Sequence, residues 1–236
     1  MLRLYQGYRL DEYQRMRHSF EPWYTEKFNA DLASPASYEI RRSTLFPILR
    51  EHIGDRKISR VLDHGGDRGD LVVGLLEGAQ SYVYDISGVE ASPGVISTND
   101  PAHCRADLII NSNVLEHVGF PRQIVAEILN ASPDGGLVYL EVPCEFPFGL
   151  SRIARRIAQV AIAAVTRPSI ARHILHPASL YMMHEHINYF SELSLTALMR
   201  ACGGRVISVG RYASSGRAGN ADMAWCLGTN QRNNRT

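Results

Sequence analysis

The sequence predicts an α/β fold built around a doubly wound, mostly parallel sheet. Between residues 58 and 143, five short apolar segments typical of strands alternate with glycine-rich turns and helical patterns. The expected strands are 58–63, 81–84, 94–97, 106–111 and 137–142, and the expected helices are 71–78 and 121–131. At 236 residues, the chain suits one such domain with insertions.

The domain prediction separates a helical N-terminal extension, residues 1–54, from the α/β domain, residues 55–236. Apolar spacing in the extension predicts helices near 11–18 and 37–52. Pro47 lies inside the second helix and is expected to kink or restart it. Another helical pattern, rich in arginine, lies within the predicted insertion 145–183.

Composition indicates an ordinary globular protein. The net charge of +1 gives no field that would attract nucleic acid, so no nucleic-acid partner is expected. The four cysteines are widely spaced and are expected to be core residues in a reducing compartment. No secretory signal is recognised near Met1 and no apolar run reaches 18 residues, so a cytoplasmic location is expected.

The loop after the first predicted strand contains more acids than a phosphate site tolerates. Asp63, Asp67 and Asp70 accompany one arginine, Arg68, whereas a dinucleotide site must accept a pyrophosphate. Like charges about 4 Å apart near a protein surface repel by kcal-scale energies. The loop therefore favours a cationic ligand such as S-adenosylmethionine, which has a sulfonium, an ammonium and no phosphate.

An acid at the end of the second predicted strand is placed to bind a ribose. Asp85 follows Asp63 by about 20 residues, a spacing that suits hydrogen bonds to ribose hydroxyls. This chemistry serves any adenosine-bearing ligand and does not separate S-adenosylmethionine from NAD. The segment 98–100, which includes Asn99, either approaches the adenine amino group or forms a turn.

Four blocks of the sequence resemble class I S-adenosylmethionine-dependent methyltransferases. They are Val61-Leu62-Asp63-x-Gly65-x-x-x-Gly69, Asp85, the segment Asp107 to Val118, and Pro133-Asp-Gly-Gly-Leu-Val. The family's middle loop glycine is Asp67 here. The resemblance implies a Rossmann-like sheet of seven strands with an antiparallel last strand near 221–228, and S-adenosylhomocysteine as product. It also implies a cofactor-binding set: Asp63, Gly65, Gly66, Asp67, Gly69, Asp85, Ile86, Asn99, Asn111 and His117, the last being structural in the alternative interpretation.

A second segment, from Tyr181 to Ser191, carries groups suited to acid–base chemistry. His184, Glu185 and His186 are adjacent, and imidazoles exchange protons near neutral pH. A zinc site is the alternative, but ligands two residues apart do not converge on one ion and no third ligand is evident, so no metal is predicted. Ser191 is expected to cap a following helix.

The pattern Y-x-x-H-E-H-x-x-Y-F-S resembles sugar methyltransferases, particularly C-methyltransferases of nucleotide-linked keto-sugars. The resemblance implies that Tyr181, His184, Glu185 and His186 line a sugar pocket and assist proton removal. The four-cysteine zinc module of those enzymes has no counterpart in residues 1–54, so both O- and C-methylation stay open. Residues 150–167 are interpreted as a lid, a homodimer contact or a peripheral membrane contact.

The sequence thus predicts a methyltransferase acting on a saccharide or nucleotide-sugar acceptor. Three alternatives remain: a small-molecule O- or N-methyltransferase outside sugar metabolism, a non-catalytic adenosyl-binding scaffold, and a NAD-dependent sugar oxidoreductase. The acidic loop disfavours the last of these.

Overall fold

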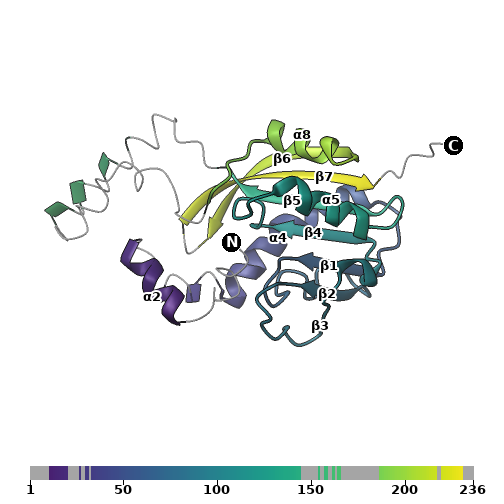
Figure 1. Cartoon of the computed structure of the whole chain (residues 1–236), viewed down its shortest axis with the longest axis horizontal. Helices are drawn as coiled ribbons and strands as arrows, with labels where there is room; N and C mark the ends of the chain where they lie inside the picture. The colour runs from purple at the N-terminus through teal and green to yellow at the C-terminus, as the bar shows by residue number, and fades with distance from the viewer. Residues whose placement is uncertain are drawn as a thin grey trace.

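The protein is described by a computed structural model that covers residues 11–20, 27, 30–31, 33–144, 154, 157–158, 161–162, 164–165, 186–216 and 219–230. A seven-stranded sheet forms its centre (Figure 1), in the order β3-β2-β1-β4-β5-β7-β6. The strands are β1 (Arg60–His64), β2 (Gln80–Tyr84), β3 (Val95–Ser97), β4 (Leu108–Ser112), β5 (Leu137–Pro143), β6 (Gly204–Gly216) and β7 (Gly219–Asn230).

The strand directions confirm the predicted sheet. The strands β1 to β5 pair in parallel, and β7 is antiparallel to both of its neighbours, β5 and β6. The chain proceeds from β1 outward to β3, then returns to place β4 on the other side of β1. Such a reversal opens a crevice beyond the carboxyl ends of β1 and β4, which is where ligands bind in open α/β sheets.

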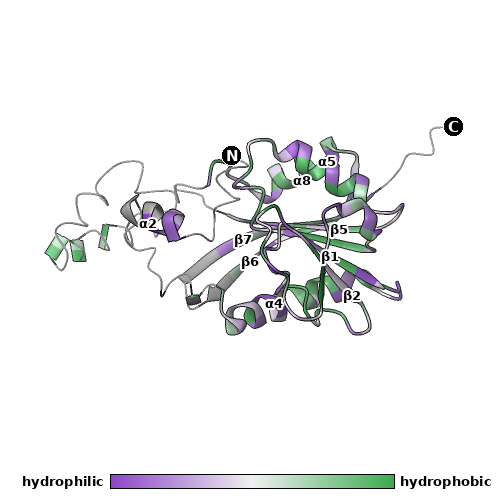
Figure 2. Ribbon diagram, turned by 60° about the horizontal axis from the view of Figure 1, so that its bottom comes forward, coloured by the Kyte–Doolittle hydropathy of each residue, from purple (hydrophilic) through white to green (hydrophobic). Residues whose placement is uncertain are grey.

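Helices cover both faces of the sheet. Helices α5 (Pro121–Ala131) and α8 (Glu192–Ala201) pack on one face of the sheet and form one core cluster with it. Helix α4 (Pro35–Ile53) packs on the other face and forms the second cluster (Figure 2). Neighbouring residues of β4 divide between the clusters, Ile109 to the first and Ile110 to the second, because successive strand side chains point to opposite faces. The short helices α2 (Asp11–Phe20) and η1 (Pro101–Cys104) complete the described elements.

Helix α4 shares the core of the sheet. Ser34 caps its N-terminus by accepting a hydrogen bond from the Ser37 N–H, and Leu45, Leu49 and Ile53 bury one face at a spacing of four residues. The helix does not restart at Pro47. Pro47 cannot donate a hydrogen bond to the carbonyl of Ser43, four residues earlier. Because Ser43 is exposed to water, this missing bond does not break the helix.

The prediction of a helix at 71–78 is wrong. This segment is a series of turns, although Leu71, Val72 and Leu75 are buried as a helical face would be. Gly74 and Gly78 adopt φ values of 63° and 73°, which lie outside the right-handed helical region. The apolar spacing therefore predicted the buried residues correctly, but the positive φ values of the two glycines prevent a helical backbone.

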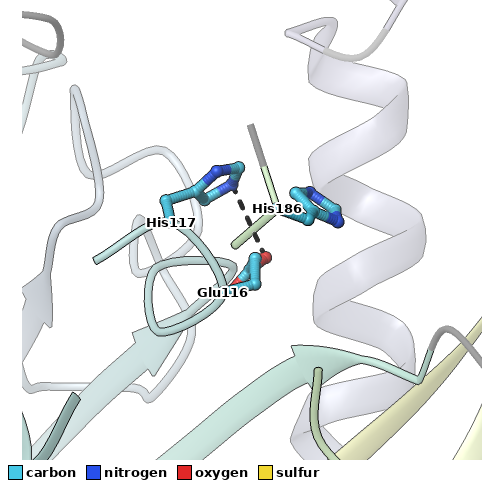
Figure 3. A group of neighbouring side chains, drawn as sticks. All are labelled: Glu116, His117 and His186. Atoms are coloured by element: carbon cyan, nitrogen blue, oxygen red, sulfur yellow. Dashed lines mark ion pairs between the residues drawn. The ribbon is translucent and has the colours of Figure 1, made fainter. Parts of the chain in front are cut away.

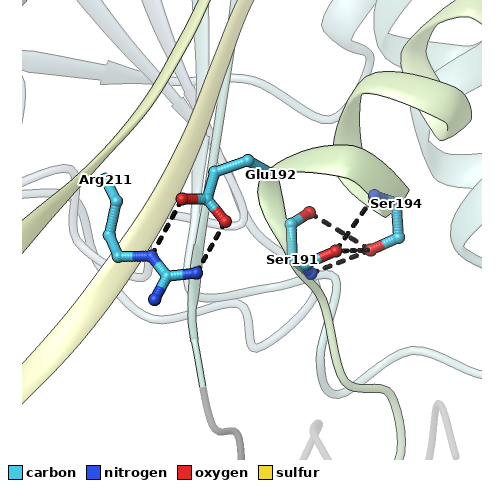
Figure 4. Close-up of polar contacts among 4 residues, drawn as sticks. All are labelled: Ser191, Glu192, Ser194 and Arg211. Atoms are coloured by element: carbon cyan, nitrogen blue, oxygen red, sulfur yellow. Dashed lines mark hydrogen bonds and ion pairs between the residues drawn. The ribbon is translucent and has the colours of Figure 1, made fainter.

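The start of α8 is fixed as the sequence predicted. The Ser191 hydroxyl accepts from the Ser194 N–H at 3.2 Å, and the Ser194 hydroxyl accepts from the Ser191 N–H at 2.8 Å (Figure 4). The adjacent Glu192 forms a two-point contact with Arg211 of β6, at 2.7 and 2.9 Å. These contacts attach the beginning of α8 to the edge of the sheet.

Most of the predicted insertion 145–183 lies outside the described residues. Within 150–167, the described positions are helical and exposed, including Ile157, Ile162 and Val165. The lid, homodimer and membrane interpretations of this segment stay predictions. Across the described part of the chain, no helix is long and apolar enough to cross a membrane.

Substitution of Ser191→Ala should lower the free energy of unfolding by about 1 kcal/mol, because it removes the capping acceptor. For a chain of this size, the melting temperature should fall by roughly 2–4 °C. Ser43→Ala is the matched control, since Ser43 is an exposed residue inside α4 and its loss should change stability by less than about 0.5 kcal/mol. Equal effects of the two substitutions in thermal unfolding would contradict the capping role.

Candidate active site

The loop after β1 requires its glycines for close packing. Gly65 and Gly69 have φ values of 78° and 76°, in the left-handed region that glycine adopts without strain. A Cβ atom at Gly65 would lie 2.6 Å from Val114, which follows β4, and one at Gly69 would lie 2.8 Å from Val95 of β3. The loop therefore lies directly on the segments beside it, at the crevice between β1 and β4.

Asp63, the residue before the last in β1, lies beneath this loop and is 2% exposed. A Cβ atom at Gly66 would lie 2.0 Å from the carboxyl carbon of Asp63, so only glycine lets the loop backbone approach this carboxyl group. The predicted residues Asp63, Gly65, Gly66 and Gly69 are thus brought together as one structural unit.

Asp67 stands where the family has glycine and adopts the backbone that glycine would adopt. Its φ is 57°, a conformation that aspartate tolerates better than most residues. Its N–H donates to Asp85 Oδ2 at 2.8 Å, and the Ser87 N–H donates to Asp85 Oδ1 at 2.8 Å. These bonds fix Asp85 at the end of β2, and each carboxylate oxygen retains acceptor capacity for a ribose hydroxyl.

The negative charges of this loop favour a cationic ligand. Burial raises the pKa of Asp63 to about 7; the nearby Arg41 opposes this shift, and the carboxylates of Asp85, Asp67 and Asp70 add to it. A cation among these acids would relieve their repulsion, whereas a phosphate would increase it. The acid set, together with the predicted ribose-binding role of Asp85, therefore fits S-adenosylmethionine.

Two residues of α4 that sequence reasoning missed also reach this edge. Arg41 Nη2 donates to the Ser112 hydroxyl at the end of β4, at 2.9 Å, and its guanidinium lies 5.5 Å from the ring centre of Tyr38. Burial raises the pKa of Tyr38 to about 12, opposed by Arg41 and reinforced by the carboxylates of Asp67 and Asp63. Apart from predicting a helix before the first strand, the sequence contained no indication of the contact between Arg41 and Ser112.

Three other predicted cofactor residues occupy different environments. Asn111 is fully buried, and its amide donates to the His64 carbonyl at 2.9 Å, joining β4 to β1. Ile86 and Asn99 are exposed. Asp100, next to Asn99, accepts from the Ala102 N–H and caps η1, as the turn interpretation of 98–100 predicts for this residue. The adenine contacts of Ile86 and Asn99 stay predictions.

A cluster of Glu116, His117 and His186 lies beyond the carboxyl end of β4 (Figure 3). Their ligand-type atoms are all within 4.8 Å of one another, and Glu116 Oε1 is 3.7 Å from His117 Nε2. The two imidazole rings meet edge to face with centroids 4.7 Å apart. Glu116 and His186 are buried, and His117 is half-buried.

Backbone contacts hold the two parts of this cluster together. The Glu116 carbonyl accepts from the N–H groups of Ile187 and Asn188, at 2.8 and 3.1 Å. The Asn188 amide donates to the carbonyls of Leu115 and Val118, at 2.9 and 2.6 Å. His186 is therefore docked against the segment after β4, although the two segments are distant in sequence.

The predicted acid–base group is only partly placed. Tyr181, His184 and Glu185 lie outside the described residues, so their expected position beside His186 is untested. The structure instead joins His186 to His117, a predicted residue, and to Glu116, which sequence reasoning did not select as a functional residue. Two imidazoles and one carboxylate also form a ligand set for a divalent metal, and the expectation of no metal stays a prediction.

Fold and site together define a class I S-adenosylmethionine-dependent methyltransferase: the strand order, the glycine loop set among acids, and Asp85 all agree with this class. The chain belongs to the methyltransferase-domain family, whose model matches residues 27–209. No curated protein matches the chain.

Solved structures show the same fold at low sequence identity. A chain from the complex between the Haloferax volcanii Trm112 methyltransferase activator and a methyltransferase is 13% identical, with a TM-score of 0.54 and coverage of 89% of this chain and 98% of that one. The Burkholderia thailandensis 1,6-didemethyltoxoflavin-N1-methyltransferase is 17% identical, with a TM-score of 0.51 and coverage of 84% and 92%. The magnesium protoporphyrin IX methyltransferase of Synechocystis PCC 6803 is 14% identical, with a TM-score of 0.50 and coverage of 81% and 84%.

The raised pKa of Asp63 predicts a pH-dependent affinity for S-adenosylhomocysteine. The ligand's ammonium should favour the charged carboxylate, so binding should release a proton when Asp63 is protonated in the free protein. Affinity should then rise by about 10-fold from pH 6 to pH 8 in calorimetric titrations. Asp63→Asn should abolish this pH dependence, and Asp134→Asn, at an exposed turn, should preserve it. A flat profile in the unsubstituted protein would contradict the coupling.

Proposed function

We propose that the protein transfers the methyl group of S-adenosylmethionine to an oxygen or carbon of a saccharide or nucleotide-sugar acceptor, with the Glu116–His117–His186 cluster as general base. The observation that carries this proposal is the position of the cluster. It lies beyond the carboxyl end of β4, on the same edge of the sheet as Asp63 in β1 and Asp85, which directly follows the parallel strand β2.

The cluster suits removal of one proton. When bound, the donor supplies an electrophilic methyl group on its sulfonium; the chain must orient the acceptor and take its proton. A neutral imidazole accepts a proton near neutral pH, and we assign this step to His186. Glu116, at 3.7 Å from His117, balances the positive charge that the imidazole pair gains. Orientation and proton removal supply most of the acceleration.

The saccharide assignment is supported by the segment 181–191, which resembles sugar methyltransferases. Tyr181, His184 and Glu185 would complete the acceptor pocket beside His186. The fold leaves the acceptor open, because similar structures are named for acceptors as different as a magnesium porphyrin and didemethyltoxoflavin. A small-molecule O- or N-methyltransferase is therefore the second candidate, and it would use the same proton acceptor.

An acceptor panel tests the saccharide assignment. Purified protein should transfer labelled methyl groups to at least one nucleoside-diphosphate sugar or free saccharide, measured by label transfer and mass spectrometry. The control is the same panel without protein. Transfer restricted to phenols, amines or porphyrins would reject the saccharide and support the second candidate.

Substitution of His186→Ala should lower kcat by roughly 10²–10⁴-fold, because the proton acceptor is lost. The affinity for S-adenosylhomocysteine should change by less than about 2-fold, since the residue does not bind the donor. His103→Ala is the matched control: this histidine is exposed in η1 and should retain full activity. A His186→Ala protein that methylates its acceptor at the full rate would remove His186 from this role.

Treatment with a chelator distinguishes two roles of the cluster, proton acceptor and metal site. A cluster that acts as a proton acceptor should retain its rate within about 2-fold after dialysis against EDTA, because no ion takes part. Activity that is lost on dialysis and restored by a divalent cation would instead assign Glu116, His117 and His186 to a metal site.

A further inference from the structure

A helical part of the predicted insertion presents apolar side chains to solvent. The described positions between 154 and 165 are all helical and all exposed. The large side chains among them, Ile157, Ile162 and Val165, are exposed by 64%, 63% and 85%. In Figure 1 and Figure 2, these helical pieces lie away from the sheet and from the helices that cover it. Their apolar area is therefore not used by the core of the domain.

The exposed residues share one face of a helix. Six of them follow the spacing i, i+3, i+4, i+7, i+8 and i+11, which defines a single face. This apolar stripe consists of Ala154, Ile157, Ala158, Ala161, Ile162 and Val165.

Helices normally bury such a face. Helix α4 does so in this chain, where Leu45, Leu49 and Ile53 pack on the sheet. A helix folded over the active site as a lid would also bury its apolar face against the domain. The exposure of the apolar stripe therefore favours a partner outside the chain over the lid interpretation.

The sequence around the apolar stripe carries charge of one sign. Between residues 146 and 184 there are five arginines, no lysine, and no aspartate or glutamate. Because the whole chain has 25 basic and 24 acidic residues, the remainder has 20 and 24, which is a net charge of −4. An apolar helix face accompanied by arginines is typical of helices that lie on anionic membranes.

Charge also distinguishes a membrane from a second copy of this chain. Two copies joined through the apolar stripe would bring two groups of five arginines close to each other, and like charges weaken such an interface. Anionic lipid head groups instead attract arginines. The apolar run 157–165 would span about 13 Å as a helix, whereas the hydrocarbon core of a bilayer is about 30 Å thick. The segment therefore suits the membrane surface and is too short to cross it.

We propose that residues 150–167 bind the surface of anionic membranes. The apolar stripe enters the boundary between head groups and acyl chains, and the arginines of 146–184 are attracted to the lipid phosphates. This role goes beyond methyl transfer and depends neither on the acceptor nor on the proton acceptor proposed above. Membrane binding would hold the candidate active site near the bilayer, because the same stretch of chain continues to His186.

Co-sedimentation of the full chain with vesicles tests this role. Vesicles of phosphatidylglycerol and phosphatidylcholine in equal amounts should bind the protein at least about 10-fold more tightly than vesicles of phosphatidylcholine alone. The difference should shrink as salt is raised to about 1 M, where the Debye length falls to about 3 Å. Equal binding to both kinds of vesicle, or binding to neither, would overturn the proposal without affecting the methyltransferase assignment.

Substitution within the apolar stripe tests its contact with lipid. Ile162→Glu should weaken binding to the anionic vesicles by at least about 10-fold, because it removes an inserted side chain and adds a charge that the lipids repel. Leu193→Glu is the matched control, since Leu193 is 83% exposed in α8, outside the segment, and its substitution should change binding by less than about 2-fold. Both variants should keep the melting temperature of the unsubstituted protein, because both sites are exposed. No loss in Ile162→Glu, or an equal loss in both variants, would contradict the role of the apolar stripe.

Sedimentation velocity without vesicles tests the second copy as the occupant. The unsubstituted protein and Ile162→Glu should sediment as the same species, because lipid rather than another chain covers the apolar stripe. A dimer that Ile162→Glu dissociates would assign the apolar stripe to an interface between copies and would overturn the membrane proposal.

Discussion

The burial of the Asp63 carboxyl group, beside three half-buried aspartates at the carboxyl ends of β1 and β2, is the constraint on which the rest of the candidate site depends. Asp63 is buried beneath its own loop, and Asp85, Asp67 and Asp70 all act against its ionisation. Desolvated like charges persist in a fold only where something compensates them. In this chain Arg41, on a helix that precedes the sheet, opposes the rise in the pKa of Asp63. A cationic methyl donor bound at the loop would add to this compensation.

Helix α4 contributes both to the core and to the charges at this edge of the sheet. Its apolar face, with Leu45 and Leu49, shares a core cluster with β1, β4 and β5. The same packing carries Arg41 to Ser112 and the buried Glu141. Stability and ligand electrostatics are therefore coupled: a change that loosens the helix also withdraws the positive charge from the acidic loop.

Backbone contacts join the two segments that form the cluster of Glu116, His117 and His186. The Glu116 carbonyl accepts from Ile187 and Asn188, and the Asn188 amide spans the carbonyls of Leu115 and Val118. These bonds carry His186 to Glu116 and His117 without relying on its side chain. The backbone position of His186 is thus set by its neighbours.

The sequence by itself determined the strand segments, the glycine loop and the capped start of α8. It also determined the place of Asp85 directly after β2. Each of these features depends on neighbouring residues or on a short, fixed spacing. It misassigned 71–78 because apolar spacing reports burial, while the positive φ of Gly74 and Gly78 decided the backbone. Only the tertiary structure joined Arg41 to Asp63 and Ser112, and Glu116 and His117 to His186. Contacts between segments this distant depend on how the sheet and its helices pack, and no local pattern encodes that packing.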